Sequence, residues 1–169
     1  MKIKILIPVY NDFESASKLI NEINSKIKNL SHEFSIILVN DASPDKVEMD
    51  VSKIDKINSI KIINMKENKG HARCIATGLK YIFENEEFDY VIPMDGDGED
   101  RPEEIKQLVD NLNYHPDKPI VGERIKRSEG IFFKFCYLVH KIITYTFTGE
   151  IIKYGNYSCL PKSTVAKMI

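Results

Sequence analysis

Two carboxylates, spaced two residues apart, lie in the loop that follows a short apolar run at residues 90–94. In the stretch MDGDGED, Asp95 and Asp97 alternate with Gly96 and Gly98. Carboxylates in alternate positions are hard oxygen ligands, and the glycines let the backbone approach a ligand closely. Oxygen ligation favours magnesium or manganese over zinc. The loop therefore predicts a site for a divalent cation, although a solvated acidic turn would give the same D-x-D pattern.

Two other apolar runs also end in polar loops. Residues 2–9 are followed by Tyr10 and Asp12, and residues 34–39 are followed by Asn40 and Asp41. If these runs are parallel strands, their carboxyl ends meet at one edge of a sheet, where ligands bind in such folds. Acidic groups that converge there repel each other unless a cation or hydrogen-bond donors neutralise them. Taken singly, each loop could instead be a turn or a helix cap.

The elements that must position these loops follow from hydrophobic periodicity. Short apolar runs predict strands at Lys2–Val9, Phe34–Val39, Ile60–Met65 and Tyr90–Met94. Apolar stripes at helical spacing predict helices over 16–30, 72–83 and 105–112, the last with Pro102 in its first turn. Weaker patterns favour helices over 47–54, 131–147 and 163–169. This alternation predicts an α/β fold, Rossmann-like, with a mostly parallel sheet and helices on both faces.

Bulk properties narrow the function classes. The chain of 169 residues fits one domain, and its 24 basic and 25 acidic residues argue against a general nucleic-acid binder. Cys74, Cys136 and Cys159 have neither disulfide nor zinc-site spacing, and they indicate reduced thiols in a cytoplasmic protein. Neither a signal peptide nor an apolar run long enough to span a bilayer is evident, so we expect a soluble chain.

Five motifs in order, between Ile5 and Met168, resemble those of inverting GT-A-fold glycosyltransferases. The similarity is to the dolichyl-phosphate mannosyltransferase and polyprenyl-phosphate sugar transferase type (family 2-like). IPVYND resembles P-x-Y-N-E, VNDASPD resembles V-D-D-x-S-x-D, and NKGHARCIATGL resembles N-x-G-x-x-x-A-x-x-x-G. MDGDGEDRPEEI resembles M-D-A-D-L-Q-x-P-P-E-x-I, and VGERIKR resembles the G-x-R-x-x-R after the fifth strand.

The resemblance implies roles for individual residues. The nucleotide-binding set would be Pro8, Tyr10, Asp12, Asp41, Gly70, Arg73 and Asp95. Within it, Asp41 would hydrogen-bond the base, and Arg73 would lie near the ribose or diphosphate. The catalytic set would be Asp95, Asp97, Arg124 and Arg127. The two aspartates would hold magnesium or manganese against the diphosphate, and the two arginines would neutralise phosphates.

One motif departs from the family pattern. Where the family carries G-D-F or G-D-Y, this chain has Gly155, Asn156 and Tyr157, an acceptor-side pair after the glycine. The family's aspartate is the candidate general base, and an amide cannot accept that proton. Two explanations remain open. A lipid-phosphate acceptor, already an anion, needs no base, and otherwise the chain is a weakened or inactive relative. We favour the first, because Arg124 and Arg127 suit a phosphate.

The sequence thus predicts metal-dependent, inverting transfer of a sugar from a UDP- or GDP-sugar to a polyprenyl phosphate. The expected place is the cytoplasmic face of the membrane. We expect a single domain over 1–169, with a nucleotide- and metal-binding core to about 122 and an acceptor-side segment over 123–169. The aromatic stretch 131–147 could pair with a second copy in a homo-oligomer.

Three alternatives differ in class. A non-catalytic relative would still bind nucleotide. A nucleotidyltransferase usually carries a glycine-rich loop after the first strand, and IPVYNDF has no glycine. A receiver domain needs an acidic pair after its first strand, whereas Asp12 stands alone there and the pair follows the fourth strand.

Overall fold

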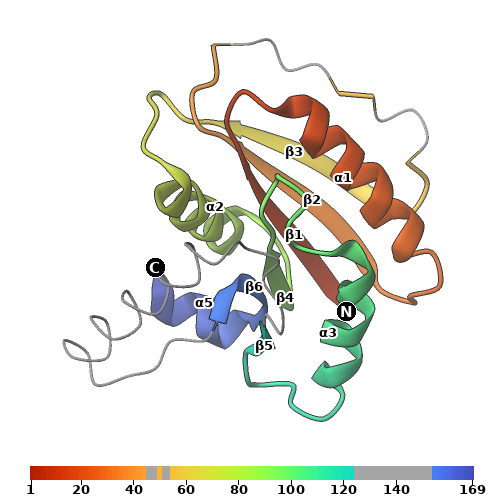
Figure 1. Cartoon of the computed structure of the whole chain (residues 1–169). Helices are drawn as coiled ribbons and strands as arrows, with labels where there is room; N and C mark the ends of the chain where they lie inside the picture. Colours follow the sequence, from red (N-terminus) through yellow and green to blue (C-terminus); the bar gives the residue numbers. More distant parts are fainter. Residues whose placement is uncertain (45–48, 51–53, 124–153) are drawn as a thin grey trace, which may run out of the picture.

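A computed structural model describes residues 1–44, 49–50, 54–123 and 154–169 (Figure 1). The strands are β1 (Lys2–Val9), β2 (Glu33–Asn40), β3 (Ile57–Asn64), β4 (Tyr90–Pro93), β5 (Ile120–Glu123) and β6 (Tyr154–Pro161). The helices are α1 (Phe13–Lys26), α2 (His71–Asn85), the 3-10 helix η1 (Pro102–Glu104), α3 (Ile105–Leu112) and α5 (Lys162–Met168). The strands form one sheet in the order β3-β2-β1-β4-β6-β5.

The first four strands of the chain are parallel, so their carboxyl ends lie at the same edge. β6 is antiparallel to both of its neighbours, β4 and β5. It therefore begins at the edge where β4 and β5 end. The prediction of a mostly parallel α/β sheet is confirmed, and β6 is its one antiparallel strand among the described residues.

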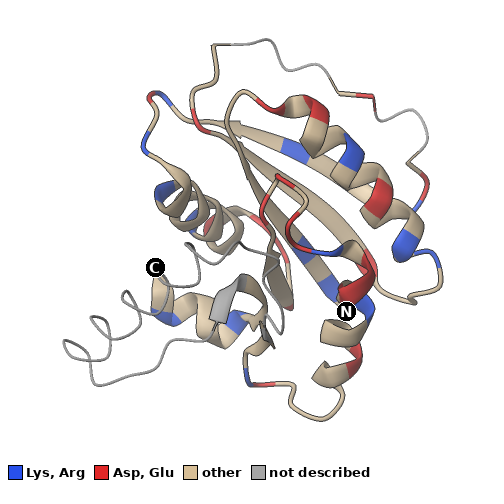
Figure 2. Cartoon of the chain, in the orientation of Figure 1, with Lys and Arg blue, Asp and Glu red and all other residues tan. Residues whose placement is uncertain are grey.

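The core lies in two layers, one on each face of the sheet (Figure 1). Alternate residues of β1 face opposite ways, so Ile3, Ile5 and Ile7 pack under α1 and α3, whereas Leu6 packs under α2. Every residue of β1 after Lys2 is buried, as expected for a central strand covered on both sides. Lysine and arginine are interspersed with aspartate and glutamate along the described elements (Figure 2).

Helix α2 lies unusually close to β1 because a glycine faces the sheet. A Cβ atom built on Gly78 would lie 2.3 Å from Cδ1 of Leu6 and 3.0 Å from Cγ2 of Val39. Both neighbours are fully buried, so neither can move aside freely. Gly78 therefore sets the distance of α2 from the sheet, and with it the position of the first turn of α2 at the edge.

A charge cluster ties the far end of α2 to the sheet. Glu86, the residue after α2, accepts hydrogen bonds from Nζ of Lys4 at 2.9 Å and from Nζ of Lys61. The side chains of Lys4 and Glu86 are only 10% and 8% exposed. Burial alone would raise the pKa of Glu86, but the hydrogen bonds and charges of the two lysines outweigh it and lower that pKa.

The helix and strand predictions hold with changes at the ends. The first helix ends at Lys26 rather than reaching Leu30, because the chain turns there and the amide of Leu30 donates to the carbonyl of Ile27 at 2.9 Å. The strand β6 was not predicted. The helix predicted over 131–147 and most of that over 47–54 lie outside the described residues. The division of function near residue 122 stays a prediction.

Two sequence expectations concern cysteines and membranes. Cys74 and Cys159 are free and buried, as expected of reduced thiols, and Cys136 lies outside the described residues. Burial raises the pKa of each thiol to about 12, so neither is a reactive thiolate at neutral pH. None of the described helices combines the length and the hydrophobicity needed to cross a bilayer.

Candidate functional site

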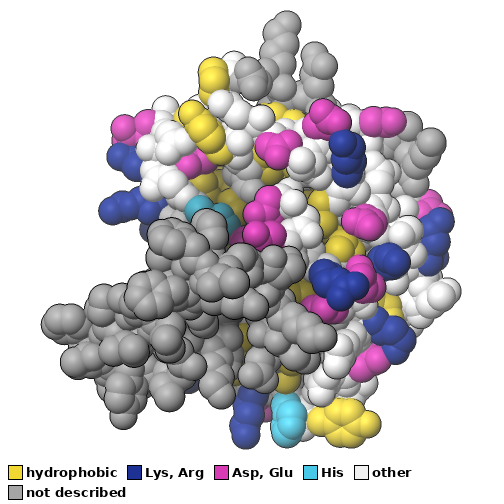
Figure 3. Space-filling view, in the orientation of Figure 1, with side chains coloured by type: hydrophobic (Ala, Val, Ile, Leu, Met, Phe, Trp, Pro, Cys, Tyr) yellow, Lys and Arg dark blue, Asp and Glu magenta, His cyan; other side chains and the backbone are white. Residues whose placement is uncertain are grey.

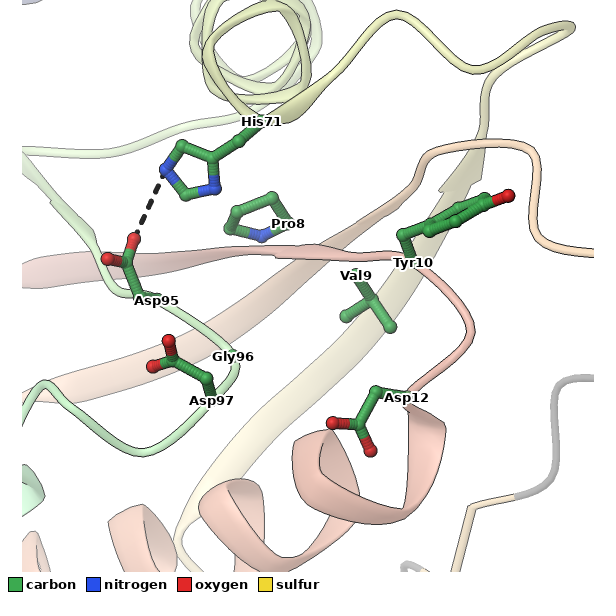
Figure 4. Close-up of a pocket in the computed structure, with 8 residues that line it drawn as sticks. All are labelled: Pro8, Val9, Tyr10, Asp12, His71, Asp95, Gly96 and Asp97. Atoms are coloured by element: carbon green, nitrogen blue, oxygen red, sulfur yellow. Dashed lines mark ion pairs between the residues drawn. The ribbon is translucent and has the colours of Figure 1, made fainter.

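A cavity of about 370 Å³ opens at the edge of the sheet where β1 and β4 end and α2 begins. Its volume lies within the range of small-molecule sites. The lining residues are Pro8, Val9, Tyr10, Asp12, His71, Asp95, Gly96 and Asp97 (Figure 4). The structure thus brings together five of the sequence-predicted site residues, from two loops, and adds a histidine. In the space-filling view, acidic side chains gather beside a histidine near the middle of this face (Figure 3).

The loop after β4 is held in shape by its own acidic residues. Asp100 is 3% exposed, and its carboxylate accepts the backbone N–H of Asp95 at 2.8 Å. Oδ1 of Asp97 accepts the backbone N–H of Glu99 at 2.9 Å. The role of Asp100 was missed from the sequence. These bonds fix the backbone from which Asp95 and Asp97 project.

Gly96 lets that loop lie against the end of β1. A Cβ atom at this position would lie 3.0 Å from the carbonyl oxygen of Pro8, which is closer than carbon and oxygen normally approach. Gly98 has a φ of +81°, a left-handed conformation that favours glycine. Gly96 therefore allows close packing and Gly98 a tight turn, and the close approach to a ligand expected from the sequence stays a prediction.

Asp12 both caps a helix and lines the cavity. Its carboxylate caps α1 by accepting the N–H of Ser15 at 3.0 Å, and it also lines the cavity. The helix cap that the sequence left open for this loop is therefore Asp12. Tyr10 is half exposed at the opposite side of the cavity from Asp95 (Figure 4).

Asp41 fastens the end of β2 to the start of α2. Its two carboxylate oxygens accept the N–H groups of Lys69 and Gly70, each at 2.8 Å, and the residue is 3% exposed. Gly70 has a φ of +83°, which sets the entry into the helix. Asp41, Gly70 and the exposed Arg73 do not line the cavity. The structure gives Asp41 a positioning role, and contact with a nucleotide base stays a prediction for it.

Asn40, at the end of β2, joins the end of β3 to the loop that follows β2. Its side-chain amide donates to Oδ1 of Asn64 at 2.8 Å, and its Oδ1 accepts the N–H of Ser43 at 3.0 Å. Oγ of Ser43 in turn accepts the N–H of Asn11 at 2.9 Å. The amide thus both donates and accepts here, which the aspartate of the family motif, when ionised, could not do. This explains how the chain tolerates asparagine at that position.

His71, the first residue of α2, meets Asp95 across the cavity edge. Its Nε2 lies 3.2 Å from Oδ1 of Asp95. The two atoms lack the alignment of a hydrogen bond, and within the described part of the chain that buried oxygen has no hydrogen-bond donor. The sequence motifs gave this histidine no role. Its position directly after Gly70, in the third motif, was the one feature of the sequence that could have pointed to a place at the site.

The residues present fit a divalent cation. A buried carboxylate oxygen without a donor is costly, and a cation would satisfy it. Asp97 lies on the same side of the cavity (Figure 4). No three His, Cys, Asp or Glu side chains in the described ranges are grouped closely enough to hold an ion by themselves. An ion here would therefore need further ligands, such as the oxygens of a bound phosphate.

The remaining predicted residues lie elsewhere. Arg124 and Arg127 fall outside the described residues. The backbone of Asn156 lies in the half of β6 nearest the cavity edge. Tyr157 is buried in the core, where its hydroxyl donates to the carbonyl of Arg101 at 2.9 Å. Burial, aided by nearby carboxylates, raises the pKa of Tyr157. Acceptor-side roles for Asn156 and Tyr157 stay predictions.

The sheet order, the antiparallel strand β6 and the acidic cavity at the carboxyl edge are features of an α/β protein of the GT-A type. The chain belongs to glycosyl transferase family 2, whose family model matches residues 4–164. The family expected from the five motifs is therefore confirmed.

Curated relatives cover almost the whole chain. It is 31% identical over 164 residues to the undecaprenyl-phosphate 4-deoxy-4-formamido-L-arabinose transferase of Proteus mirabilis. It is 30% identical over 162 residues to the protein of the same name from Photorhabdus laumondii. Each match covers 94% of this chain and 47% of the relative. The chain thus spans about half the length of these relatives.

Solved structures share the fold at lower identity. Glucosyl-3-phosphoglycerate synthase from Mycobacterium tuberculosis, in complex with UDP, matches with a TM-score of 0.65 at 13% identity, covering 96% of this chain and 57% of that one. The mannosyltransferase PcManGT from Pyrobaculum calidifontis, in complex with GDP-Man and Mn2+, matches with a TM-score of 0.57 at 15% identity. The match covers 98% of this chain and 46% of that one. TarS from S. aureus, in complex with UDP-GlcNAc, matches with a TM-score of 0.59 at 22% identity, covering 78% of this chain and 37% of that one.

Proposed function

We propose that this protein transfers a sugar, with inversion and with help from a divalent metal, from a UDP- or GDP-sugar to a polyprenyl phosphate. Family membership and relatives named as undecaprenyl-phosphate sugar transferases support the reaction class and the acceptor. Such an acceptor would bring the protein to the cytoplasmic face of a membrane. The observation that carries the donor site is the buried oxygen of Asp95, which has no hydrogen-bond donor among the described residues and belongs to a residue that lines an acidic cavity.

The donor would lie with its diphosphate against the loop after β4. Asp95 and Asp97 would hold magnesium or manganese, which supplies positive charge to the departing nucleoside diphosphate. Pro8 and Tyr10 would wall the nucleotide side of the cavity. Asp100 keeps the loop in place before the donor arrives, so little reorganisation is needed when charge develops.

The acceptor chemistry follows from the lack of a base at Asn156. In the proposed step, an oxygen of the lipid phosphate attacks the anomeric carbon while the bond to the diphosphate oxygen breaks on the opposite face. The attacking oxygen is already an anion at neutral pH, so no proton must be removed. Arg124 and Arg127 would neutralise phosphates of donor or acceptor.

Calorimetric titration of UDP and of GDP, with and without Mn²⁺, tests the donor site. We expect one nucleotide to bind in a manganese-dependent manner to the wild type, and at least about tenfold more weakly to Asp95→Asn and Asp97→Asn, because each loses a charged ligand. Asp117→Asn is the matched control, since Asp117 is exposed in the turn before β5, at the opposite edge of the sheet. A folded wild-type chain that binds neither nucleotide would refute the proposal.

The departure at Asn156 supports a second candidate, a relative that binds nucleotide without transferring sugar. Incubating the chain with donor and either a short polyprenyl phosphate or the matching polyprenol separates the two. Transfer to the phosphate alone supports the anionic acceptor. Transfer to the alcohol with equal efficiency contradicts it, and nucleotide binding without any transfer favours the non-catalytic relative.

A further inference from the structure

His71 stands at the cavity without a role in the proposed transfer. It begins α2, its ring reaches Asp95, and its side chain is 46% exposed, so a ligand in the cavity can contact it. Figure 4 shows His71, Asp95 and Asp97 on one side of the cavity, with Tyr10 and Asp12 on the other. The imidazole of His71 thus lies next to the carboxylates that the cation would use.

We propose that Nε2 of His71 and Oδ1 of Asp95 are adjacent ligands of the same cation, which makes the site selective for manganese over magnesium. The inference rests on the proposed donor site and extends it to a residue that the motif resemblance left without a role. It assigns to His71 direct contact with the ion rather than a hydrogen bond to Asp95.

The separation of the two atoms supports joint ligation. In an octahedral site with bonds of roughly 2.1 Å, neighbouring ligand atoms lie about 3.0 Å apart. Nε2 and Oδ1 are 3.2 Å apart, without the alignment that a hydrogen bond would require. An ion inserted between them would need only a small movement of either side chain. It would also satisfy Oδ1 of Asp95, for which the described part of the chain offers no hydrogen-bond donor.

The donor set explains the expected selectivity. Magnesium prefers oxygen ligands and keeps several waters, whereas imidazole suits transition metals. A nitrogen ligand therefore favours Mn²⁺ over Mg²⁺. Because no three of the described side chains are grouped closely enough to hold an ion by themselves, the ligands beyond His71, Asp95 and Asp97 would come from the diphosphate and water. Metal and nucleotide should then strengthen each other's binding by the same factor.

Two measurements on the full chain test the assignment. The first is the affinity for Mn²⁺ and for Mg²⁺, by calorimetry, in the presence of the nucleotide that binds. His71→Gln should weaken Mn²⁺ binding by about tenfold and leave Mg²⁺ binding within about threefold, since an amide oxygen replaces the nitrogen. His115→Gln, at an exposed histidine in the turn between α3 and β5, should change neither affinity.

The second measurement is pulsed electron paramagnetic resonance of the wild-type Mn²⁺–nucleotide complex, which detects coupling to a ligated ¹⁴N nucleus. We expect a directly bonded imidazole signal that disappears in His71→Gln. Manganese that binds through the aspartates with no such signal, and with equal affinity in His71→Gln, would overturn this inference and leave the proposed function intact. A wild type that binds no manganese with either nucleotide would overturn both.

Discussion

Replacing Asp100 by alanine tests whether the loop after β4 is preorganised by a buried carboxylate. The carboxylate accepts the backbone N–H of Asp95 at 2.8 Å and is 3% exposed. Alanine removes the acceptor and leaves that N–H without its partner. A hydrogen bond to a charged group contributes about 1.5–3 kcal/mol, so we expect the free energy of unfolding to fall by about 2 kcal/mol. For a domain of this size, the melting temperature should fall by about 4–8 °C.

Asparagine at the same position separates the hydrogen bond from the charge. Its side-chain oxygen can still accept the N–H of Asp95, so Asp100→Asn should recover about half of the lost stability. Urea unfolding followed by circular dichroism gives the free energies, and calorimetry gives nucleotide affinity with Mn²⁺. Affinity should fall in the same order, because the backbone that carries Asp95 loses its anchor.

Asp117→Ala is the control, since it removes an exposed carboxylate at the other edge of the sheet. Equal unfolding midpoints for Asp100→Ala and Asp117→Ala would show that the buried carboxylate does not support the loop. Normal nucleotide affinity in a destabilised Asp100→Ala would show that it supports the fold but not the site.

Two further predictions concern stability alone. Because the two lysines lower the pKa of Glu86 on folding, its contribution is present above the unfolded pKa and is lost as the pH falls through the folded value. In urea titrations from pH 7 to pH 3, Glu86→Gln should therefore be less stable than wild type by about 2 kcal/mol at pH 7. This difference in unfolding free energy should narrow as the pH falls. The exposed control Glu84→Gln should show no such difference. In Gly78→Ala, the free energy of unfolding should fall by about 1–2 kcal/mol, because the new Cβ would overlap Leu6. At an open helical site, alanine instead stabilises by about 1 kcal/mol relative to glycine. A variant more stable than wild type would therefore contradict the close approach of α2 to the sheet.

The sequence was most informative where local pattern and burial agree. The first strand was predicted over Lys2–Val9 and the structure has the same bounds, because a central strand buried on both faces is a continuous apolar run with a polar turn behind it. The polar loops were placed together at one edge by topology alone, since parallel strands end on the same side. This reasoning found Asp12, Asp95 and Asp97, all of which line the cavity.

The features that were missed depend on contacts between distant parts of the chain. The strand β6 contains glycine, asparagine and a terminal proline, and it forms only by pairing with strands more than 30 residues earlier. The buried role of Asp100 cannot be distinguished in the sequence from that of its exposed acidic neighbours. Asp41 looked like a ligand contact because of its motif, yet its oxygens accept two backbone N–H groups. For His71, the contact with Asp95 became visible only once α2 was placed.

The pairing of Glu123 with Tyr154 has a consequence for how members of this family can diverge. This pair brings residues 123 and 154 together at the edge of the sheet where β5 ends and β6 begins, although 30 residues separate them in the sequence. Doubling the length of such an insertion costs only about 0.6 kcal/mol of loop-closure entropy. The sheet can therefore keep its register while the stretch between residues 123 and 154 changes in length or sequence. Relatives can therefore differ in this stretch while the pair of strands that flanks it is retained.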